Sequence, residues 1–135
     1  MNNLYDILNI TGNKEEKIKS CISNVRLELE DLIEDQTCKI YSSYISEELY
    51  KNHIINRIIR TGEVSSYDHH FVLVPNDGDS YYLIDLTYSQ FKNDNFEKLL
   101  SDGYMVISKD ELNNYLRIVT SGSINKKIDD IYFLK

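Results

Sequence analysis

Covalent chemistry in this chain would depend on a thiol, an imidazole and a carboxylate, and the sequence holds 2 cysteines and 3 histidines. The cysteines are Cys21 and Cys38, and the histidines are His53, His69 and His70. A thiol becomes a nucleophile when it is partly exposed, when its thiolate is favoured, and when a base held by a third group lies within hydrogen-bonding reach. These three requirements select among the candidate residues.

Cys38 meets the first two requirements through its place in an expected helix. The segment that begins near Thr37 has an apolar stripe at helical spacing, made of Cys38, Tyr41, Ile45 and Leu49. Asp35 or Thr37 can cap this helix, which puts Cys38 in its first turn. Unpaired backbone N–H groups and the helix macrodipole favour negative charge there, so they lower a thiol pKa from its usual ~8.5. The simpler alternative is that Cys38 is a buried helix residue.

A predicted hairpin offers the base and its orienting group. Two β-type runs, 71–74 and 81–85, flank the turn signal "PNDGD". His69 and His70 stand at the entry to the first strand, and Asp85 stands at the exit of the second. The start of the first strand lies beside the end of the second in an antiparallel pair, so Asp85 and a histidine become neighbours. The alternative is that these residues are ordinary polar strand ends.

Apolar periodicity predicts helices on both sides of this hairpin. The first three predicted helices cover residues 14–35, a segment from about residue 37, and residues 53–60, where Gly62 ends the helix. A fourth covers residues 93–101, with Phe96, Leu99 and Leu100 facing inward. The capping box Ser108–Glu111 opens a fifth, whose apolar residues are Leu112, Tyr115, Leu116 and Val119. "YMVI" predicts a third strand, and "IYFLK" a last strand or a docked tail. This order indicates the α+β class, with N-terminal helices packed on a small antiparallel sheet, in a single domain of residues 1–135.

The composition restricts the classes of function. The net charge of −7 argues against nucleic-acid binding, which needs clustered basic side chains. No stretch reaches the ~20 apolar residues of a membrane span, and we expect no secretory signal because the start lacks its basic and apolar regions. Cys21 lies on the apolar stripe of the first helix and is expected to be a small buried hydrophobe. We expect no disulfide, no metal site and no cofactor.

Two segments bear a resemblance to the papain-like and transglutaminase-like cysteine-enzyme superfamily. "TCKIYSSYISEEL" resembles its nucleophile helix, with a cysteine at the start and the small residue Ser42 four positions later. "HHFVLV…YLIDLTYSQF" resembles its histidine and aspartate strands. The pattern I-D-x-T, followed by an aromatic residue and then Gln-Phe, is similar to papain-like bacterial toxin and effector domains. The resemblance covers residues 36–91 and implies a compact papain-like core.

The resemblance assigns a role to each matching residue. It implies that Cys38 is the nucleophile, His69 the base and Asp85 the orienting acid. The family pattern of histidine, any residue and an aromatic matches His69 to Phe71, which favours His69. His70 remains the alternative base, because it directly precedes the hydrophobic alternation as the papain histidine does.

Further residues are candidates for supporting roles. An oxyanion hole needs hydrogen-bond donors, and the backbone N–H of Cys38 at the helix start is one. Gln36 is a candidate side-chain donor, since papain-like enzymes use a glutamine upstream of the nucleophile. Gln90 is a second candidate near Asp85, and Thr87 can brace the Asp85 loop by a side-chain hydrogen bond.

The function implied is thiol-dependent acyl transfer on a protein or peptide substrate, by a cysteine protease or a glutamine deamidase or transglutaminase-like enzyme. The superfamily resemblance further implies a bacterial toxin or effector that acts in a reducing cytosol, is delivered into another cell, and meets an immunity or inhibitor protein. The alternative is a small acidic binding protein without catalysis, such as a toxin-neutralising immunity protein, whose charge of −7 suits a basic partner.

Overall fold

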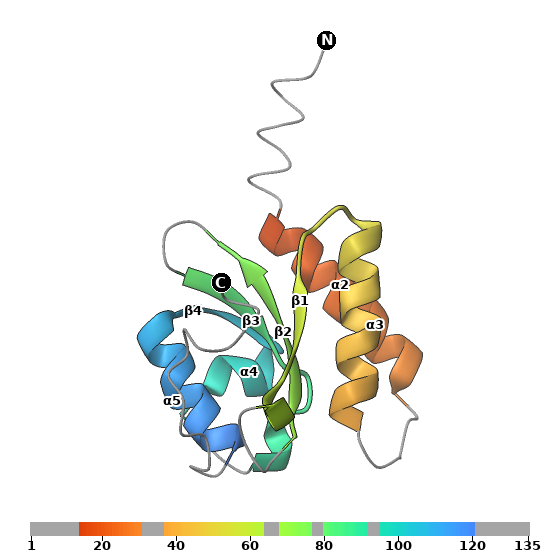
Figure 1. Ribbon diagram of the computed structural model, residues 1–135. Helices are drawn as coiled ribbons and strands as arrows, with labels where there is room; N and C mark the ends of the chain where they lie inside the picture. The colour runs from red at the N-terminus through yellow and green to blue at the C-terminus, as the bar shows by residue number, and fades with distance from the viewer. Residues whose placement is uncertain (1–13, 31–36, 64–67, 77–79, 92–94, 121–135) are drawn as a thin grey trace.

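An antiparallel sheet of four strands, in the order β1-β2-β3-β4, forms the centre of the protein (Figure 1). The computed structural model describes residues 14–30, 37–63, 68–76, 80–91 and 95–120. The strands are β1 (Arg57–Arg60), β2 (His70–Pro75), β3 (Ser80–Ile84) and β4 (Tyr104–Ser108). The helices are α2 (Lys14–Leu29), α3 (Thr37–Lys51), α4 (Glu97–Ser101) and α5 (Lys109–Val119), with 3-10 turns η1 (Thr61–Glu63) and η2 (Tyr88–Phe91).

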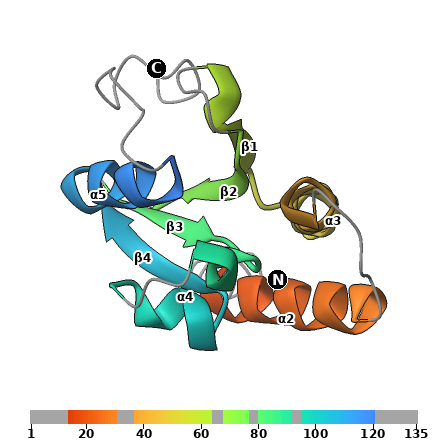
Figure 2. The same ribbon diagram turned by 90° about the horizontal axis from the view of Figure 1, so that it is seen from below.

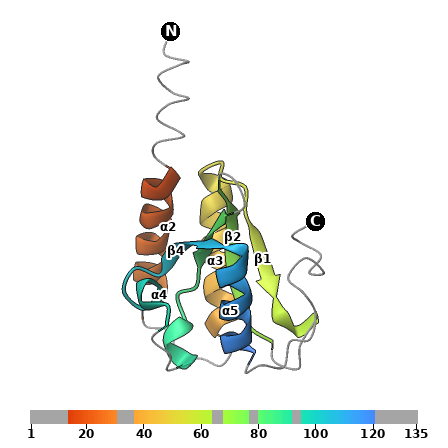
Figure 3. The same cartoon turned by 90° about the vertical axis from the view of Figure 1, so that its left-hand side faces the viewer.

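Helices cover both faces of this sheet, which confirms the predicted α+β class with two N-terminal helices packed on antiparallel strands. Figures 2 and 3 show α5 on one side of the sheet and α3 on the other. None of the described helices has both the length and the apolarity needed to cross a bilayer. The prediction that residues 1–135 form one domain stays a prediction.

The alternation of side chains along β2 divides the core in two. Phe71 and Leu73 point to the α5 side, where they pack with Leu83, Ile107 and helix residues of α4 and α5. Val72 and Val74 point to the opposite side and pack with residues of α2 and α3. Burial on both faces explains why "HFVLV" reads as a nearly continuous apolar run.

The segment 57–60 is a strand, so the prediction of a helix over 53–60 is wrong. Helix α3 has already ended, and His53 adopts a left-handed conformation with φ of 61° that reverses the chain. Ile59 is buried and Ile58 is 37% exposed, which is the alternation of a strand. Pairing of Ile59 with Phe71 in β2 supplies the packing that decides the outcome, and β-branched isoleucines suit it.

The remaining elements follow the predictions with local corrections. The first helix ends at Leu29, and part of its expected extension lies outside the described residues. The capping box at Ser108 is present, with reciprocal hydrogen bonds to Glu111. Leu100, expected to face inward, is 41% exposed, because the short helix α4 buries Leu99 instead. The final segment "IYFLK" lies outside the described residues.

Candidate active site

His69 and Asp85 form a hydrogen-bonded pair at the end of the hairpin. The Nε2 atom of His69 lies 2.9 Å from Oδ2 of Asp85, and each residue is only 3% exposed. The register pairs Val72 with Ile84, so the next position along places Asp85 opposite Phe71 and diagonal to His69. The hairpin therefore brings together the two side chains that the sequence singled out as base and orienter.

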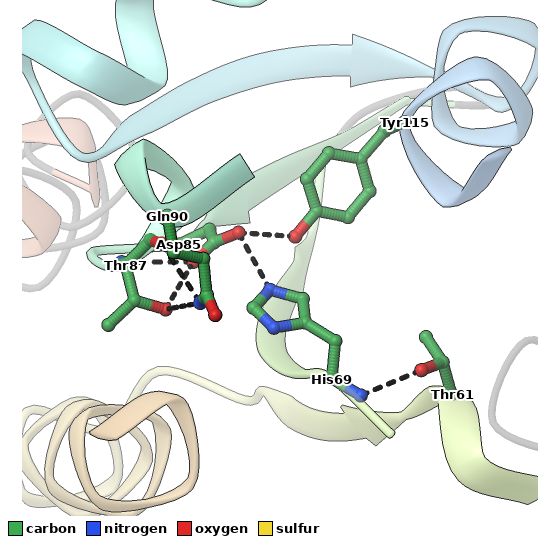
Figure 4. A network of polar contacts seen from close by, with 6 residues as sticks. All are labelled: Thr61, His69, Asp85, Thr87, Gln90 and Tyr115. Carbon is green, nitrogen blue, oxygen red and sulfur yellow. Dashed lines mark hydrogen bonds and ion pairs between the residues drawn. The ribbon is translucent and has the colours of Figure 1, made fainter. Parts of the chain in front are cut away.

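Four hydrogen bonds hold the Asp85 carboxylate (Figure 4). Its Oδ1 accepts from the backbone N–H of Thr87 at 3.1 Å and from the Thr87 hydroxyl at 3.2 Å. Its Oδ2 accepts from the Tyr115 hydroxyl at 2.5 Å and from His69. The Thr87 N–H, the Thr87 hydroxyl and the Tyr115 hydroxyl all donate to this carboxylate, which leaves it as the acceptor toward His69. The proton shared with His69 therefore lies on Nε2, and the other ring nitrogen, Nδ1, is left to act as a base.

The backbone and ring of His69 are fixed from several directions. Its N–H donates to the Thr61 hydroxyl at 2.8 Å, and its carbonyl accepts from the Thr61 N–H at 3.0 Å. The ring of Phe91 meets the imidazole edge to face, with centroids 4.8 Å apart. Figure 4 shows the second ring nitrogen on the side away from Asp85. The histidine is therefore preorganised rather than free to rotate.

Cys38 lies in the first turn of α3, half-buried, and interacts with this pair. Burial alone would raise the pKa of the Cys38 thiol, but hydrogen bonding from the His69 side chain and from the His70 backbone N–H lowers it below its ordinary value. Burial likewise opposes the charged form of His69, but hydrogen bonds to Asp85 and Cys38 raise its pKa to about 9. The two shifts together favour a thiolate beside an imidazolium.

His70, the alternative base, is placed differently from His69. Its side chain is buried, and Nδ1 has no hydrogen-bond partner among the described residues. The nearest carboxylate is that of Asp68, whose Oδ1 is 4.0 Å from Nδ1. Burial lowers the pKa of His70, and the nearby Arg60, His69 and Lys39 lower it further against the opposing charge of Asp68. Among the described residues, His70 therefore has no carboxylate in hydrogen-bonding contact, whereas His69 has Asp85.

A pocket of about 500 Å³ opens beside the thiol. Its walls come from the first turns of α3 and from the ends of β1 and β2, and they include Cys38, Lys39, Arg60, Asp68 and His70. This volume falls in the range of small-ligand sites. Cys38 itself lines the pocket, so a group bound there would lie beside this residue.

The supporting residues have mixed outcomes. Thr87 braces Asp85 through both its backbone and its hydroxyl, as the sequence suggested. The Gln90 amide donates to the Thr87 carbonyl at 3.0 Å and to the Thr87 hydroxyl at 3.1 Å. Gln90 thus supports the Asp85 loop, and its amide protons are not directed at a substrate oxygen. Gln36 lies outside the described residues.

Sequence reasoning missed Tyr115, Thr61 and Phe91 as members of the site. Tyr115 is fully buried, and its pKa is raised well above the ordinary value by burial and by the Asp85 charge, so it is a neutral donor. Its only sequence signal was a place in the apolar stripe of the last helix, which also fits a core residue. The polar end of a tyrosine in such a stripe usually needs a partner, and here the partner is Asp85.

Comparisons with protein-family models, with curated proteins and with solved structures gave no significant match. The superfamily likeness therefore stays a resemblance that depends on the residues of this chain. Within the described part of the chain, no group of three His, Cys, Asp or Glu side chains could hold a metal ion.

Proposed function

We propose that this protein is a thiol-dependent acyl-transfer enzyme, with Cys38 as nucleophile, His69 as acid and base, and Asp85 as the group that orients His69. The observation that supports this most is that one buried imidazole interacts with a carboxylate through Nε2 and also with a thiol whose pKa it lowers. This is the arrangement of nucleophile, base and orienter on which covalent acyl transfer depends.

The first half of the proposed reaction acylates the enzyme. The Cys38 thiolate attacks the carbonyl carbon of an amide, forming a C–S bond and a tetrahedral oxyanion. The N–H groups at the start of α3 have no intrahelical partner and favour negative charge, so they can stabilise this oxyanion. When the intermediate collapses, the C–N bond breaks and the leaving amine takes the proton of the His69 imidazolium. A thioester on Cys38 remains.

The second half releases the acyl group. Neutral His69 removes a proton from water, or from an amine acceptor, which attacks the thioester carbonyl. The C–S bond breaks, Cys38 leaves as a thiolate, and His69 is protonated again. Throughout, Asp85 holds the imidazole in one tautomer through Nε2. Water as acceptor gives hydrolysis, and an amine gives transfer.

The proposed substrate is a protein or peptide, attacked at a peptide bond or at a glutamine side-chain amide. The resemblance to papain-like toxin and effector domains supports this substrate class. It also supports action in a reducing cytosol, where a catalytic thiol stays reduced, and an immunity or inhibitor protein as a partner.

Alkylation by iodoacetamide tests the thiol assignment, because only the thiolate reacts. We expect Cys38 to be modified near pH 7 at least about 50-fold faster than Cys21, with an apparent pKa below ~8.5. Cys21 is a matched internal control, since burial raises its pKa. Peptide mapping by mass spectrometry measures both rates. Equal labelling of the two cysteines, or an ordinary pKa at Cys38, contradicts the proposal.

The pH dependence of acyl transfer should differ from that of alkylation. Turnover needs a thiolate and an imidazolium together, so it should fall in acid as Cys38 is protonated and fall in base as His69 loses its proton near pH 9. Alkylation needs only the thiolate and should persist above that pH.

Because the substrate is unidentified, loss of toxicity in cells on Cys38→Ala is the corresponding functional measurement.

A non-catalytic acidic binding protein is the second candidate. The net charge of −7 favours it, because such a charge suits a basic partner. It predicts slow alkylation of Cys38 and no effect of Cys38→Ala in cells, so the same two measurements distinguish it from the enzyme.

A further inference from the structure

The pocket beside Cys38 has an electrostatic character opposite to that of the whole chain. The protein has a net charge of −7, yet the pocket is lined by Lys39 and Arg60 and by a single carboxylate, Asp68. Neither cation forms an ion pair with any residue that the structure describes. A locally positive pocket on an acidic protein indicates a site for a negatively charged group.

The strand register explains how these groups meet. Arg60 is paired directly with His70 across β1 and β2, so both side chains stand on the same face of the sheet. That face is the one covered by α3, whose first turn provides Cys38 and Lys39. The pocket floor therefore consists of Arg60 and His70, and its wall consists of the helix that bears the thiol.

His70 is a second polar residue of this pocket, next to Arg60. The residue is 8% exposed, and Nδ1 lacks a hydrogen-bond partner among the described residues. A buried polar atom without a partner is costly and rare, and it is often completed by a ligand or water. Asp68 does not fill this place, because its Oδ1 accepts from the Gly62 N–H at 3.1 Å and stays 4.0 Å from His70.

We infer that this pocket recognises a carboxylate of the protein or peptide substrate, next to the carbonyl that Cys38 attacks. The inference rests on the proposed acyl transfer and adds a substrate class, an acidic residue or chain terminus beside the attacked amide. The guanidinium of Arg60 matches a carboxylate through paired N–H donors. Lys39 adds a second positive charge, and His70 adds a buried hydrogen-bonding group.

Two alkylating reagents that differ in charge test this pocket. Iodoacetate and iodoacetamide both form an S–C bond to Cys38 and release iodide, but only iodoacetate presents a carboxylate. The measured quantity is the ratio of their rate constants at Cys38, divided by the ratio for a neutral free thiol. We expect this normalised ratio to exceed one, and to decrease as salt screens the pocket.

Arg60→Gln should lower the ratio about fivefold, the order expected for one charge near the surface. Arg57→Gln is the matched control, because Arg57 is also exposed in β1 but points to the other face, opposite Leu73. The His69 charge is common to both variants and cancels from their comparison. If Cys38 reacts fast with iodoacetamide but the normalised ratio is equal in Arg60→Gln and Arg57→Gln, the carboxylate pocket is overturned. The proposal that Cys38 is the nucleophile is unaffected by that result.

A second measurement does not depend on thiol reactivity. Glutarate is titrated into Cys38→Ser, and the NMR signals of His70 and Arg60 are followed. A saturable shift that is lost when Arg60→Gln is added supports the pocket even if Cys38 proves unreactive. The absence of a shift overturns the pocket, and so does an equal response to inorganic phosphate, because the site would then not select carboxylates.

Discussion

Cys21 and Cys38 occupy neighbouring helices of the same layer, yet their surroundings favour opposite forms of the thiol. Cys21 lies in the middle of α2, is 1% exposed, and has its pKa raised by burial and by the negative charge of Glu48. Cys38 lies in the first turn of α3, half-buried, and has its pKa lowered. Burial acts on both in the same direction.

The two thiols differ in the charged groups beside them. The hairpin supplies the charged neighbour of Cys38, which is the His69 imidazole. Among the described residues, Cys21 accepts a weak hydrogen bond from the Asn52 amide at 3.5 Å, and the charges of Glu48 and Lys17 act on its pKa in opposite directions. Cys38 has an imidazole whose own positive charge is stabilised by the buried Asp85. The comparison indicates that the lowered pKa of Cys38 comes from a partner brought by β2 and β3, and not from helix position or exposure alone.

Removing His69 should abolish most of the difference between the two cysteines. In His69→Ala, burial still opposes the thiolate at Cys38 while its main stabilising partner is gone. We expect the rate of iodoacetamide labelling at Cys38 near pH 7 to fall by at least about 30-fold, and labelling of Cys21 to stay unchanged. Labelling at high pH should recover, since the thiol itself is intact.

His70→Ala is the matched control, because it removes the neighbouring histidine and leaves the backbone N–H that interacts with the thiol. It should change the labelling rate of Cys38 by no more than about threefold. The opposite result, a large loss in His70→Ala and a small one in His69→Ala, would transfer the role of base to His70.

Asp85→Asn should have the next largest effect, on reactivity and on stability together. The amide removes the negative charge beside His69 and presents a donor to a site that already contains four donors. We expect the labelling rate of Cys38 near pH 7 to fall about tenfold, and the free energy of unfolding to fall by about 2–4 kcal/mol.

Urea unfolding and mass-spectrometric labelling measure the two effects of Asp85→Asn. Asp68→Asn serves as the control, because Asp68 is an exposed carboxylate that accepts from the Gly62 N–H and lies 4.0 Å from Nδ1 of His70. It should reduce stability by less than about 1 kcal/mol. Similar stabilities for both variants would mean that Asp85 is not the centre of a coupled network.

The sequence predicted the parts of the site that depend on local topology. An Asp-Gly turn between two apolar runs requires an antiparallel hairpin, and this alone places Asp85 beside a histidine. The helix over Thr37–Lys51 followed from its apolar period, so Cys38 could be placed in a first turn. Each of these inferences uses contacts between residues close in the chain.

The parts that the sequence mistook or left open depend on contacts distant in the chain or on strand phase. The isoleucines of 57–60 fit a helix by spacing, and only the edge of β2 makes them a strand. The choice between His69 and His70 depends on where β2 begins, because a shift of one residue exchanges the two faces of the sheet. Tyr115 approaches Asp85 from the last described helix, 30 positions later, which no local pattern reveals.

Tyr115→Phe should produce the smallest effect and the most specific one. The tyrosine hydroxyl and His69 donate to the same oxygen of Asp85, so they compete for its negative charge. Without the hydroxyl, Asp85 becomes a stronger acceptor for His69, and the pKa of His69 should rise further above about 9. We expect an upward shift of ~0.5 pH unit in the NMR titration of the imidazole, and a loss of about 1 kcal/mol in stability.

Tyr50→Phe separates this electrostatic effect from the loss of a tyrosine hydrogen bond as such. Tyr50 donates to the Asn56 carbonyl at 2.6 Å, away from the catalytic triad proposed here. It should cost less stability than Tyr115→Phe, because Tyr50 is 55% exposed, and it should leave the His69 titration in place. If Tyr115→Phe lowers the pKa of His69, or moves it no more than Tyr50→Phe does, Tyr115 has only a packing role. If the pKa of His69 rises only in Tyr115→Phe, Tyr115 is a positioning residue that moderates the negative charge on Asp85. Through Asp85 and His69 it then also affects the thiolate form of Cys38, which distinguishes Cys38 from Cys21.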